Sequence, residues 1–193
     1  MSALSATGRT GPANAAAGLQ AARAVLSSLV RDVPDFPEPG VLFKDINPVL
    51  ADPSAFSTVV DALAGIARAA GATTVTGIEA RGFLLAAPVA LATQARLVPI
   101  RKAGKLPGAT AARTYDLEYG RATLEVQQDA LRPGERVLLI DDVLATGGTA
   151  AAAAGLVSDA GAEVVGMAVL IELLFLKGRG RLPGLPVTAL LEV

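Results

Sequence analysis

Cysteine, histidine and tryptophan are all missing from this sequence. Their absence excludes disulfides, thiolate nucleophiles, Ser-His-Asp triads and the usual zinc sites. Any proton transfer in an active site must therefore use a carboxylate, a lysine or a tyrosine.

The sequence also lacks a strong net charge and a long hydrophobic run. The net charge is −1 over 193 residues, which gives no overall field to attract nucleic acid or a membrane surface. Hydrophobic residues make up 52% of the chain, but the longest apolar stretches, 82–93 and 164–171, are shorter than the ~18 residues of a membrane-spanning helix. We therefore expect no nucleic-acid partner and no membrane partner.

The first residues, 1–17, are small and polar, and they lack the basic start and apolar run of a signal peptide. We interpret 1–17 as a mobile N-terminal tail and residues 18–193 as a single domain of ordinary size. We expect the protein to be cytoplasmic, although the cysteine count alone does not settle the compartment.

Apolar periodicity along the chain predicts alternating helices and strands. The predicted helices cover residues 18–31, 53–70, 82–95 and 149–160. The predicted strands cover residues 73–78, 97–101, 136–140, 163–171 and, at an edge, 187–191. A proline-rich connector, 32–40, and a hairpin made of 114–118 and 123–127 interrupt this alternation. Short apolar strands separated by helices indicate an α/β fold, with a central, mostly parallel sheet flanked by helices.

One segment, Val137–Thr149, combines two carboxylates with a glycine-rich turn in the string VLLIDDVLATGGT. Asp141 and Asp142 follow a predicted strand, and in a parallel sheet such positions lie at the ligand-binding edge. Their oxygens can accept hydrogen bonds from the vicinal hydroxyls of a ribose. The next residues form a small loop at a helix start, whose backbone N–H groups and hydroxyls can surround a phosphate. That loop consists of Ala145, Thr146, Gly147, Gly148 and Thr149.

This segment therefore predicts a site for a ribose that carries a 5-phosphate. The alternative explanation is a simple strand-to-helix turn in which Asp142 or Thr149 only caps the helix, and the whole string makes that alternative the poorer one. Other nucleotide-binding motifs fail. Gly104-Lys105 is not followed by a hydroxyl residue, and 178–183 lacks the third glycine of a dinucleotide fingerprint.

The string VLLIDDVLATGGT resembles the phosphoribosyl pyrophosphate (PRPP) signature of the type I phosphoribosyltransferases. Further similarity runs in order from about Phe36 to the C-terminus and points to the adenine-specific members of that family. The similar segments are FPEPGVLFKDINPVL (36–50), GIEARGF (77–83), IRKAGKLPG (100–108), TYDLEYG (114–120) and IELLFLKG (171–178). The resemblance implies the type I phosphoribosyltransferase fold, with a small hood and a flexible closing loop beside the central sheet.

The resemblance also implies a role for individual residues. Asp141 and Asp142 would hold the ribose of PRPP, and the loop 145–149 would hold its 5-phosphate. Glu118 would handle a proton of the base when the segment 102–120 closes. The implied pyrophosphate contacts are Arg81, Arg101, Lys102 and Lys105. The implied adenine contacts are Leu42, Phe43, Lys44 and Leu173.

The implied reaction converts adenine and PRPP to AMP and pyrophosphate, with Mg²⁺ as cofactor and a homodimer as the assembly. The metal would be held mainly by substrate oxygens and water rather than by protein side chains. A cis peptide between Glu79 and Ala80 is implied as well.

Two alternatives to this reaction stay open at the level of sequence. One is a phosphoribosyltransferase for another purine, such as a 6-oxopurine, because a hood that reads the base through backbone groups leaves little trace in sequence. The other is a non-catalytic regulator that senses PRPP on the same fold. A regulator would usually carry a DNA-binding module or a basic face, and the sequence has neither.

Overall fold

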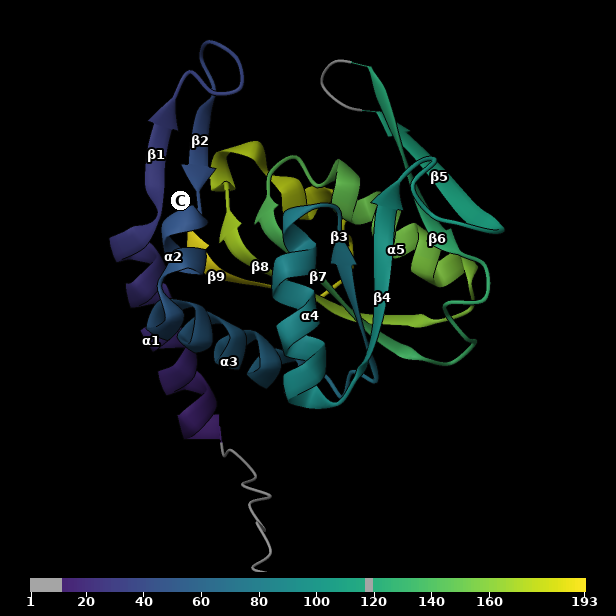
Figure 1. The fold of residues 1–193 in the computed structure, drawn as a ribbon, viewed down its shortest axis with the longest axis horizontal. Helices are drawn as coiled ribbons and strands as arrows, with labels where there is room; N and C mark the ends of the chain where they lie inside the picture. Colours follow the sequence, from purple (N-terminus) through teal and green to yellow (C-terminus); the bar gives the residue numbers. More distant parts are fainter. Residues whose placement is uncertain (1–11, 117–119) are drawn as a thin grey trace, which may run out of the picture.

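The computed structural model describes residues 12–116 and 120–193, in which helices and strands alternate (Figure 1). The α-helices are α1 (Pro12–Leu29), α2 (Asn47–Ala51), α3 (Pro53–Ala69), α4 (Arg81–Thr93) and α5 (Gly148–Asp159). The strands are β1 (Arg31–Pro34), β2 (Leu42–Asp45), β3 (Thr74–Ile78), β4 (Arg96–Lys102), β5 (Thr110–Asp116), β6 (Arg121–Gln127), β7 (Arg136–Leu144), β8 (Glu163–Glu172) and β9 (Val187–Glu192). Between β8 and β9 lie two short 3-10 helices, η1 (Leu174–Leu176) and η2 (Gly178–Arg181).

Seven strands of the described residues form one sheet, in the order β5-β6-β4-β3-β7-β8-β9. The strands β4, β3, β7, β8 and β9 run parallel to one another, whereas β6 pairs antiparallel with both β4 and β5. The predicted α/β fold with a mostly parallel sheet is therefore confirmed, and so is the edge position of β9.

Helices cover both faces of this sheet and create two apolar clusters. On one face, α3 and α4 contribute the fully buried Leu63 and Leu85, which share a cluster with Leu138 of β7. On the other face, α5 contributes Leu156, which shares a cluster with Leu139. Because adjacent residues of a strand point to opposite faces, β7 must be apolar on both sides, as its sequence is. Within the described part of the chain, no helix meets the length and hydropathy that a transmembrane span requires.

The first helix differs from its prediction. α1 begins at Pro12, not at Gly18, and it ends at Leu29. Part of the predicted tail, 1–17, is therefore helical, and the high alanine content of this stretch explains why, because alanine has the best helix propensity. Residues 1–11 lie outside the described part, so the division into a tail and a domain stays a prediction.

One strand was not predicted, and another is longer than predicted. β1 begins at Arg31 and extends into the predicted proline-rich connector, where it pairs antiparallel with β2. β7 does not end at Ile140 but continues through Leu144, because its last residues still pair with β8. The two aspartates of the carboxylate–glycine string therefore lie inside the strand, near its carboxyl end.

Two hairpins stand at the edge of the sheet where β3 and β4 end (Figure 1). The β1–β2 pair is the small hood expected beside the sheet. The β5–β6 pair confirms the predicted hairpin, although β5 begins at Thr110 rather than at Thr114. Residues 117–119, which join its strands, lie outside the described part. The carboxyl ends of β3, β4 and β7 thus lie between two projecting hairpins.

Two glycines let the start of α4 pack directly against these strand ends. A Cβ on Gly77 of β3 would lie 2.8 Å from the Cβ of Ala86 in α4. A Cβ on Gly82 would lie 2.7 Å from the carbonyl oxygen of Ile140 in β7. Real Cβ atoms do not approach other atoms so closely, so neither position tolerates a side chain. This packing brings Arg81, the first residue of α4, to the end of β7.

Candidate active site

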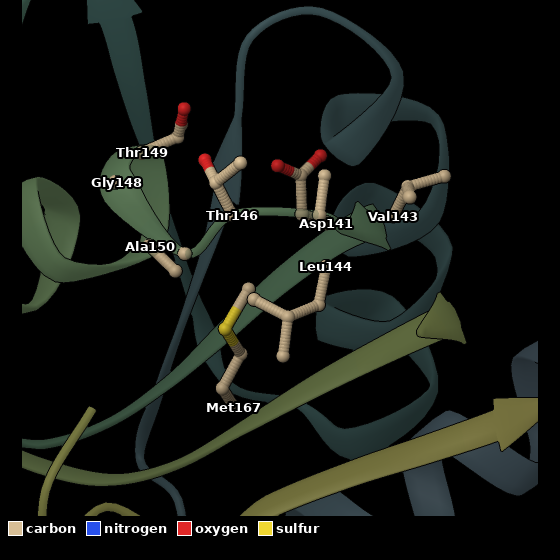
Figure 2. A pocket seen from close by; sticks show the side chains of 10 residues that line it. Asp141, Val143, Leu144, Thr146, Gly148, Thr149, Ala150 and Met167 are labelled. Carbon is tan, nitrogen blue, oxygen red and sulfur yellow. The ribbon is translucent and has the colours of Figure 1, made fainter. Parts of the chain in front are cut away.

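The two aspartates of β7 form the centre of the site. Asp141 and Asp142 alternate across the strand, and the backbone N–H of Asp142 donates a hydrogen bond to Oδ1 of Asp141 at 2.9 Å. Asp142 is buried, whereas Asp141 is half-buried. Figure 2 shows the Asp141 carboxylate on the same side of the loop as the hydroxyls of Thr146 and Thr149.

The charges of this carboxylate pair are only partly balanced. Oδ2 of Asp142 lies 2.9 Å from Nη1 of Arg81, but the angles do not make a hydrogen bond, and this buried oxygen has no hydrogen-bond partner among the described residues. Burial, followed by repulsion from Asp142, raises the pKa of the Asp141 carboxyl well above its ordinary value. Donors or cations of a ligand would therefore stabilise the charged form of the pair.

The predicted phosphate loop, Ala145–Thr149, forms a small pocket next to Asp141. Its cavity volume of about 80 Å³ suits a compact group, such as a phosphate, better than a purine. In Figure 2 the oxygens of Thr146 and Thr149 lie on one side of this pocket, and the apolar side chains of Leu144 and Met167 lie on the other. Two hydroxyl groups thus line one side of a pocket with an apolar floor.

The start of α5 completes this pocket with free backbone donors. Gly147 occupies the N-cap position with a φ of 81°, and no side chain caps the helix there. The first N–H groups of a helix lack partners within the helix and carry its positive dipole end. An anion at this position would satisfy them, as the sequence predicted.

Two residues that the sequence analysis did not select support the phosphate loop. A Cβ on Gly147 would collide with the carbonyl of Gly178, in the segment between β8 and β9. From β5, the hydroxyl of Tyr115 accepts a hydrogen bond from Oγ1 of Thr149 at 3.0 Å. The resemblance included both residues in similar segments, but only the fold shows that they touch the loop.

Three of the four predicted pyrophosphate contacts surround the carboxylate of Glu79, a residue to which the sequence assigned no role. Glu79 follows β3, and its side chain is only 6% exposed. It accepts hydrogen bonds from Nε of Arg101 at 3.1 Å, from the backbone N–H of Lys102 at 3.0 Å and from Nζ of Lys105 at 2.6 Å. Nη1 of Arg101 also donates to the carbonyl of Lys105 at 3.0 Å, which closes the loop between them.

Burial alone would raise the pKa of Glu79, but the hydrogen bonds from Lys105 and from the backbone of Lys102, together with the nearby cations, lower it overall. Glu79 is thus ionised and fixes three of the four predicted pyrophosphate contacts at one place. Its position beside Arg81 at the end of a buried strand was the signal that sequence reasoning could have used. The implied cis peptide between Glu79 and Ala80 is confirmed.

Arg81 links the carboxylate pair to the hood. Besides its ion pair with Asp142, its guanidinium lies 4.9 Å from the centre of the Phe43 ring. The ring of Phe43 in turn packs edge-to-face with Phe36, at 5.0 Å between ring centres. A cation over an aromatic face is attracted by the ring quadrupole. The predicted base-binding ring therefore lies next to the predicted pyrophosphate and ribose residues.

The other predicted adenine contacts lie in β2 and directly after β8. Leu42 is exposed, so its side chain is accessible to a ligand. Nζ of Lys44 pairs with Asp32 across the hood at 2.6 Å. Leu173 follows β8 and donates its N–H to the carbonyl of Leu144 at 3.0 Å.

The described residues test neither the predicted role of Glu118 nor the predicted Mg²⁺. Glu118, the predicted proton-handling group, lies outside the described residues. Among the described residues, no three His, Cys, Asp or Glu side chains gather closely enough to hold a metal ion by themselves.

Comparisons with known proteins agree with this geometry. Residues 48–183 match the phosphoribosyl transferase domain family, which defines the class of this fold and site. The chain is 61% identical over 188 residues to the adenine phosphoribosyltransferase of Frankia alni, which covers 97% of this chain and 96% of that protein. The chain therefore belongs to the adenine phosphoribosyltransferase family.

Solved structures extend the similarity to three dimensions. The adenine phosphoribosyltransferase of Rhodothermus marinus is 51% identical, with a TM-score of 0.85 over 89% of this chain and 98% of that one. The enzyme of Saccharomyces cerevisiae is 38% identical, with a TM-score of 0.84 over 88% of this chain and 98% of that one. The yeast structure contains adenine and an imino-altritol bisphosphate.

Proposed function

We propose that this chain is an adenine phosphoribosyltransferase, a pentosyltransferase that converts adenine and PRPP to AMP and pyrophosphate in purine salvage. The observation that carries the proposal is the end of β7, where a carboxylate pair adjoins a phosphate-sized pocket at the start of α5. A relative named adenine phosphoribosyltransferase aligns with nearly the whole chain, and the structure of the yeast relative was solved with adenine.

The reaction replaces one bond at the anomeric carbon of the ribose by another. The bond to pyrophosphate breaks, and an imidazole-ring nitrogen of adenine bonds to the same carbon and loses its proton. Because the ribose passes through a cation-like state, the negative charge of Asp141 and Asp142 stabilises it, as carboxylates do at other anomeric carbons. Binding of the remote 5-phosphate at Ala145–Thr149 positions this carbon for attack.

The leaving pyrophosphate needs cations, and the described residues offer them at the same edge of the sheet. Arg81 starts α4 beside the carboxylate pair, and Arg101 and Lys105 are held on Glu79. A fixed cation stabilises developing negative charge without reorganising during the reaction. Lys102 contributes to this arrangement through its backbone N–H, which Glu79 accepts.

The hood supplies the surfaces that bind the base. We assign one face of adenine to Phe43 and the opposite face to Leu173, and the purine edge to backbone groups of Leu42 and Lys44. The exposed rim of the hood and its position beside Arg81 support this assignment. An aromatic ring against a purine contributes both apolar burial and stacking.

We assign the proton of the base to Glu118 on the family resemblance, because the sequence has no histidine or cysteine for this task. Closure of the segment 102–120 would exclude water, which would otherwise hydrolyse PRPP. The change Glu118→Gln is expected to lower kcat more than it weakens PRPP binding, because the amide cannot take the proton. Steady-state kinetics and PRPP titration measure the two effects, and an unchanged kcat would remove Glu118 from the mechanism.

We also propose Mg²⁺ as the cofactor. The fit is good for an ion that keeps its waters: one carboxylate pair is present, and an oxygen of Asp142 is buried without a hydrogen-bond partner among the described residues. Asp141 and Asp142 would contact the ion or its waters, and phosphate oxygens of the substrate would supply most other ligands. When bound, the ion neutralises charge on the pyrophosphate as it departs.

A homodimer in the cytoplasm completes the proposal. Leu84 and Leu91 lie seven residues apart on one face of α4 and are exposed by 51% and 83%, and the nearby Leu97 of β4 is exposed as well. A group of large exposed apolar side chains often marks a protein interface. Sedimentation or light scattering would test the dimer, and a monomer at micromolar concentration would contradict it.

The decisive test of the activity supplies the purified protein with PRPP, Mg²⁺ and one purine base at a time. We expect pyrophosphate release with adenine and little release with hypoxanthine or guanine. Turnover only with a 6-oxopurine would overturn the base assignment. Binding of PRPP without turnover of any base would instead identify a PRPP sensor.

A further inference from the structure

An ion pair between the buried Glu172 and the half-exposed Arg179 lies outside the residues assigned above. Glu172 is the last residue of β8, and its side chain is only 3% exposed. Nε and Nη2 of Arg179, in η2, donate to its two oxygens at 2.6–2.8 Å, which is a two-pronged contact. Nη2 also lies 3.5 Å from Oε1 of Glu192 in β9. Glu172 and Glu192 are in register on neighbouring strands, so the positive charge of Arg179 reduces the repulsion between their carboxylates.

The segment that this pair encloses touches the site twice. Just after Glu172, the backbone N–H of Leu173 donates to the carbonyl of Leu144 at 3.0 Å, directly before the phosphate loop. Just before Arg179, Gly178 packs so closely on the carbonyl of Ala145 that a Cβ there would collide with it. The carbonyl of Gly178 also leaves no room for a Cβ on Gly147. Both ends of the segment therefore support the loop Ala145–Thr149.

We propose that Glu172 and Arg179 are positioning residues for PRPP binding: by fixing the segment between them, they hold the 5-phosphate loop in its binding conformation. The proposal rests on the proposed function, because it assigns the 5-phosphate to that loop. The pair acts through backbone contacts of Leu173 and Gly178 and does not touch the ligand itself.

A role in stability alone explains the pair less well. Burying a charge is costly, and apolar residues of similar volume stabilise a core as well or better. What a two-pronged arginine–carboxylate contact supplies is a fixed geometry, because the planar guanidinium matches both oxygens at once. Lysine keeps the charge but not this geometry, so Arg179→Lys separates the two contributions.

The experiment compares Arg179→Lys with a matched control, Arg136→Lys. Arg136 is equally exposed, at 44% against 43%, and also pairs with a glutamate, at 2.8 Å from Glu163, but it lies at the opposite end of β7. Two readouts are taken well below the melting temperature: the dissociation constant of ribose 5-phosphate by calorimetry, and KM and kcat with PRPP and adenine.

We expect Arg179→Lys to raise the ribose 5-phosphate dissociation constant and the KM for PRPP about tenfold. The reason is that a small displacement of the loop that binds the 5-phosphate weakens its contacts with the ligand. We expect kcat to change less, and Arg136→Lys to change neither constant by more than twofold. Glu172→Gln, which preserves the side-chain volume, should reproduce the Arg179→Lys result more weakly.

Ribose 5-phosphate binding decides the outcome for any variant that folds. If Arg179→Lys binds it like the unchanged protein, or if the control weakens it equally, the positioning role is overturned. A protein that does not turn over adenine would contradict the proposed function, but the difference in ribose 5-phosphate binding between the two variants would still test the pair. The two proposals therefore fail in distinguishable ways.

Discussion

Two carboxylates at the ends of neighbouring parallel strands have pKa values that are shifted in opposite directions. Glu79, directly after β3, is buried beneath three hydrogen-bond donors, and its pKa is lowered. Asp141, near the end of β7, has another carboxylate beside it, and its pKa is raised. The two strands are paired in the sheet, so the difference arises locally, from the burial of each carboxylate and from the charges beside it.

Glu79 helps to shape the site through its contacts within the protein, whereas Asp141 and Asp142 keep charge available for a ligand. Glu79 has its partners within the protein, and its hydrogen bonds fix Arg101 and Lys105. Asp141 and Asp142 have one cation, Arg81, and a buried oxygen without a hydrogen bond among the residues described. Unbalanced charge of this kind is characteristic of functional sites. Replacing each carboxylate by its amide tests this contrast.

The largest effect is expected for Asp142→Asn, which keeps the shape but removes the charge. We expect kcat/KM for PRPP to fall about a hundredfold, because a lost charge-assisted hydrogen bond costs up to about 3 kcal/mol. Steady-state kinetics with saturating adenine measure the change. Asp61→Asn, at an exposed position of α3, is the control and should leave the rate unchanged. A similar rate in both variants would show that the β7 pair does not act on the substrate.

The next largest effect is expected for Glu79→Gln. We expect the free energy of unfolding to fall by about 2 kcal/mol, since Arg101, Lys105 and a backbone N–H lose their charged acceptor. This figure is below that of a fully buried pair because both cations are partly exposed. Urea denaturation measures it, with Glu163→Gln at an exposed pair as control. Equal losses in both variants would mean that Glu79 is no more than a surface partner.

A smaller effect of opposite sign is expected for Asp141→Asn. In the ligand-free protein, this change should raise the free energy of unfolding by about 1 kcal/mol near neutral pH, because removing unbalanced charge at a functional site commonly stabilises a fold. The amide oxygen can still accept the hydrogen bond from Asp142. Thermal denaturation without ligand measures the change. A lower melting temperature would contradict the view that Asp141 is held at a cost to stability.

The smallest effect concerns how these stability differences depend on pH. For Asp141, whose pKa is raised, the stability present below its ordinary value of 3.8 is lost as pH rises through the folded value. For Glu79, whose pKa is lowered, stability is present above its ordinary value of 4.5 and is lost as pH falls through the folded value. The differences between each amide variant and the unchanged protein should therefore have opposite signs and both shrink at low pH.

Unfolding measured across a series of buffers tests this expectation. As the pH falls, the gain in stability from Asp141→Asn and the loss from Glu79→Gln should both diminish. A difference that grows as the pH falls, in either variant, would contradict the assigned pKa direction.

Much of the fold followed from local sequence. Buried strands such as β3, β7 and β8 contain continuous apolar runs, and Asp52 caps α3 through the backbone N–H groups of Ser54 and Ala55. Two of the mistakes concern strands whose extent depends on distant contacts. β1 exists because it pairs with β2, and β7 reaches Leu144 because β8 continues beside it.

The sequence by itself determined the chemistry that the site can use. Without histidine or cysteine, and with Asp141-Asp142 followed by a glycine-threonine loop, it specified a sugar-phosphate site served by carboxylates. Only the tertiary structure decided which charges remain free for a ligand. It placed Glu79 beneath the cations, Arg81 between Asp142 and Phe43, and Gly178 against the phosphate loop. The physical reason is that hydrogen bonds and ion pairs depend on separations of a few ångströms between residues far apart in sequence, and only the packed sheet sets those separations.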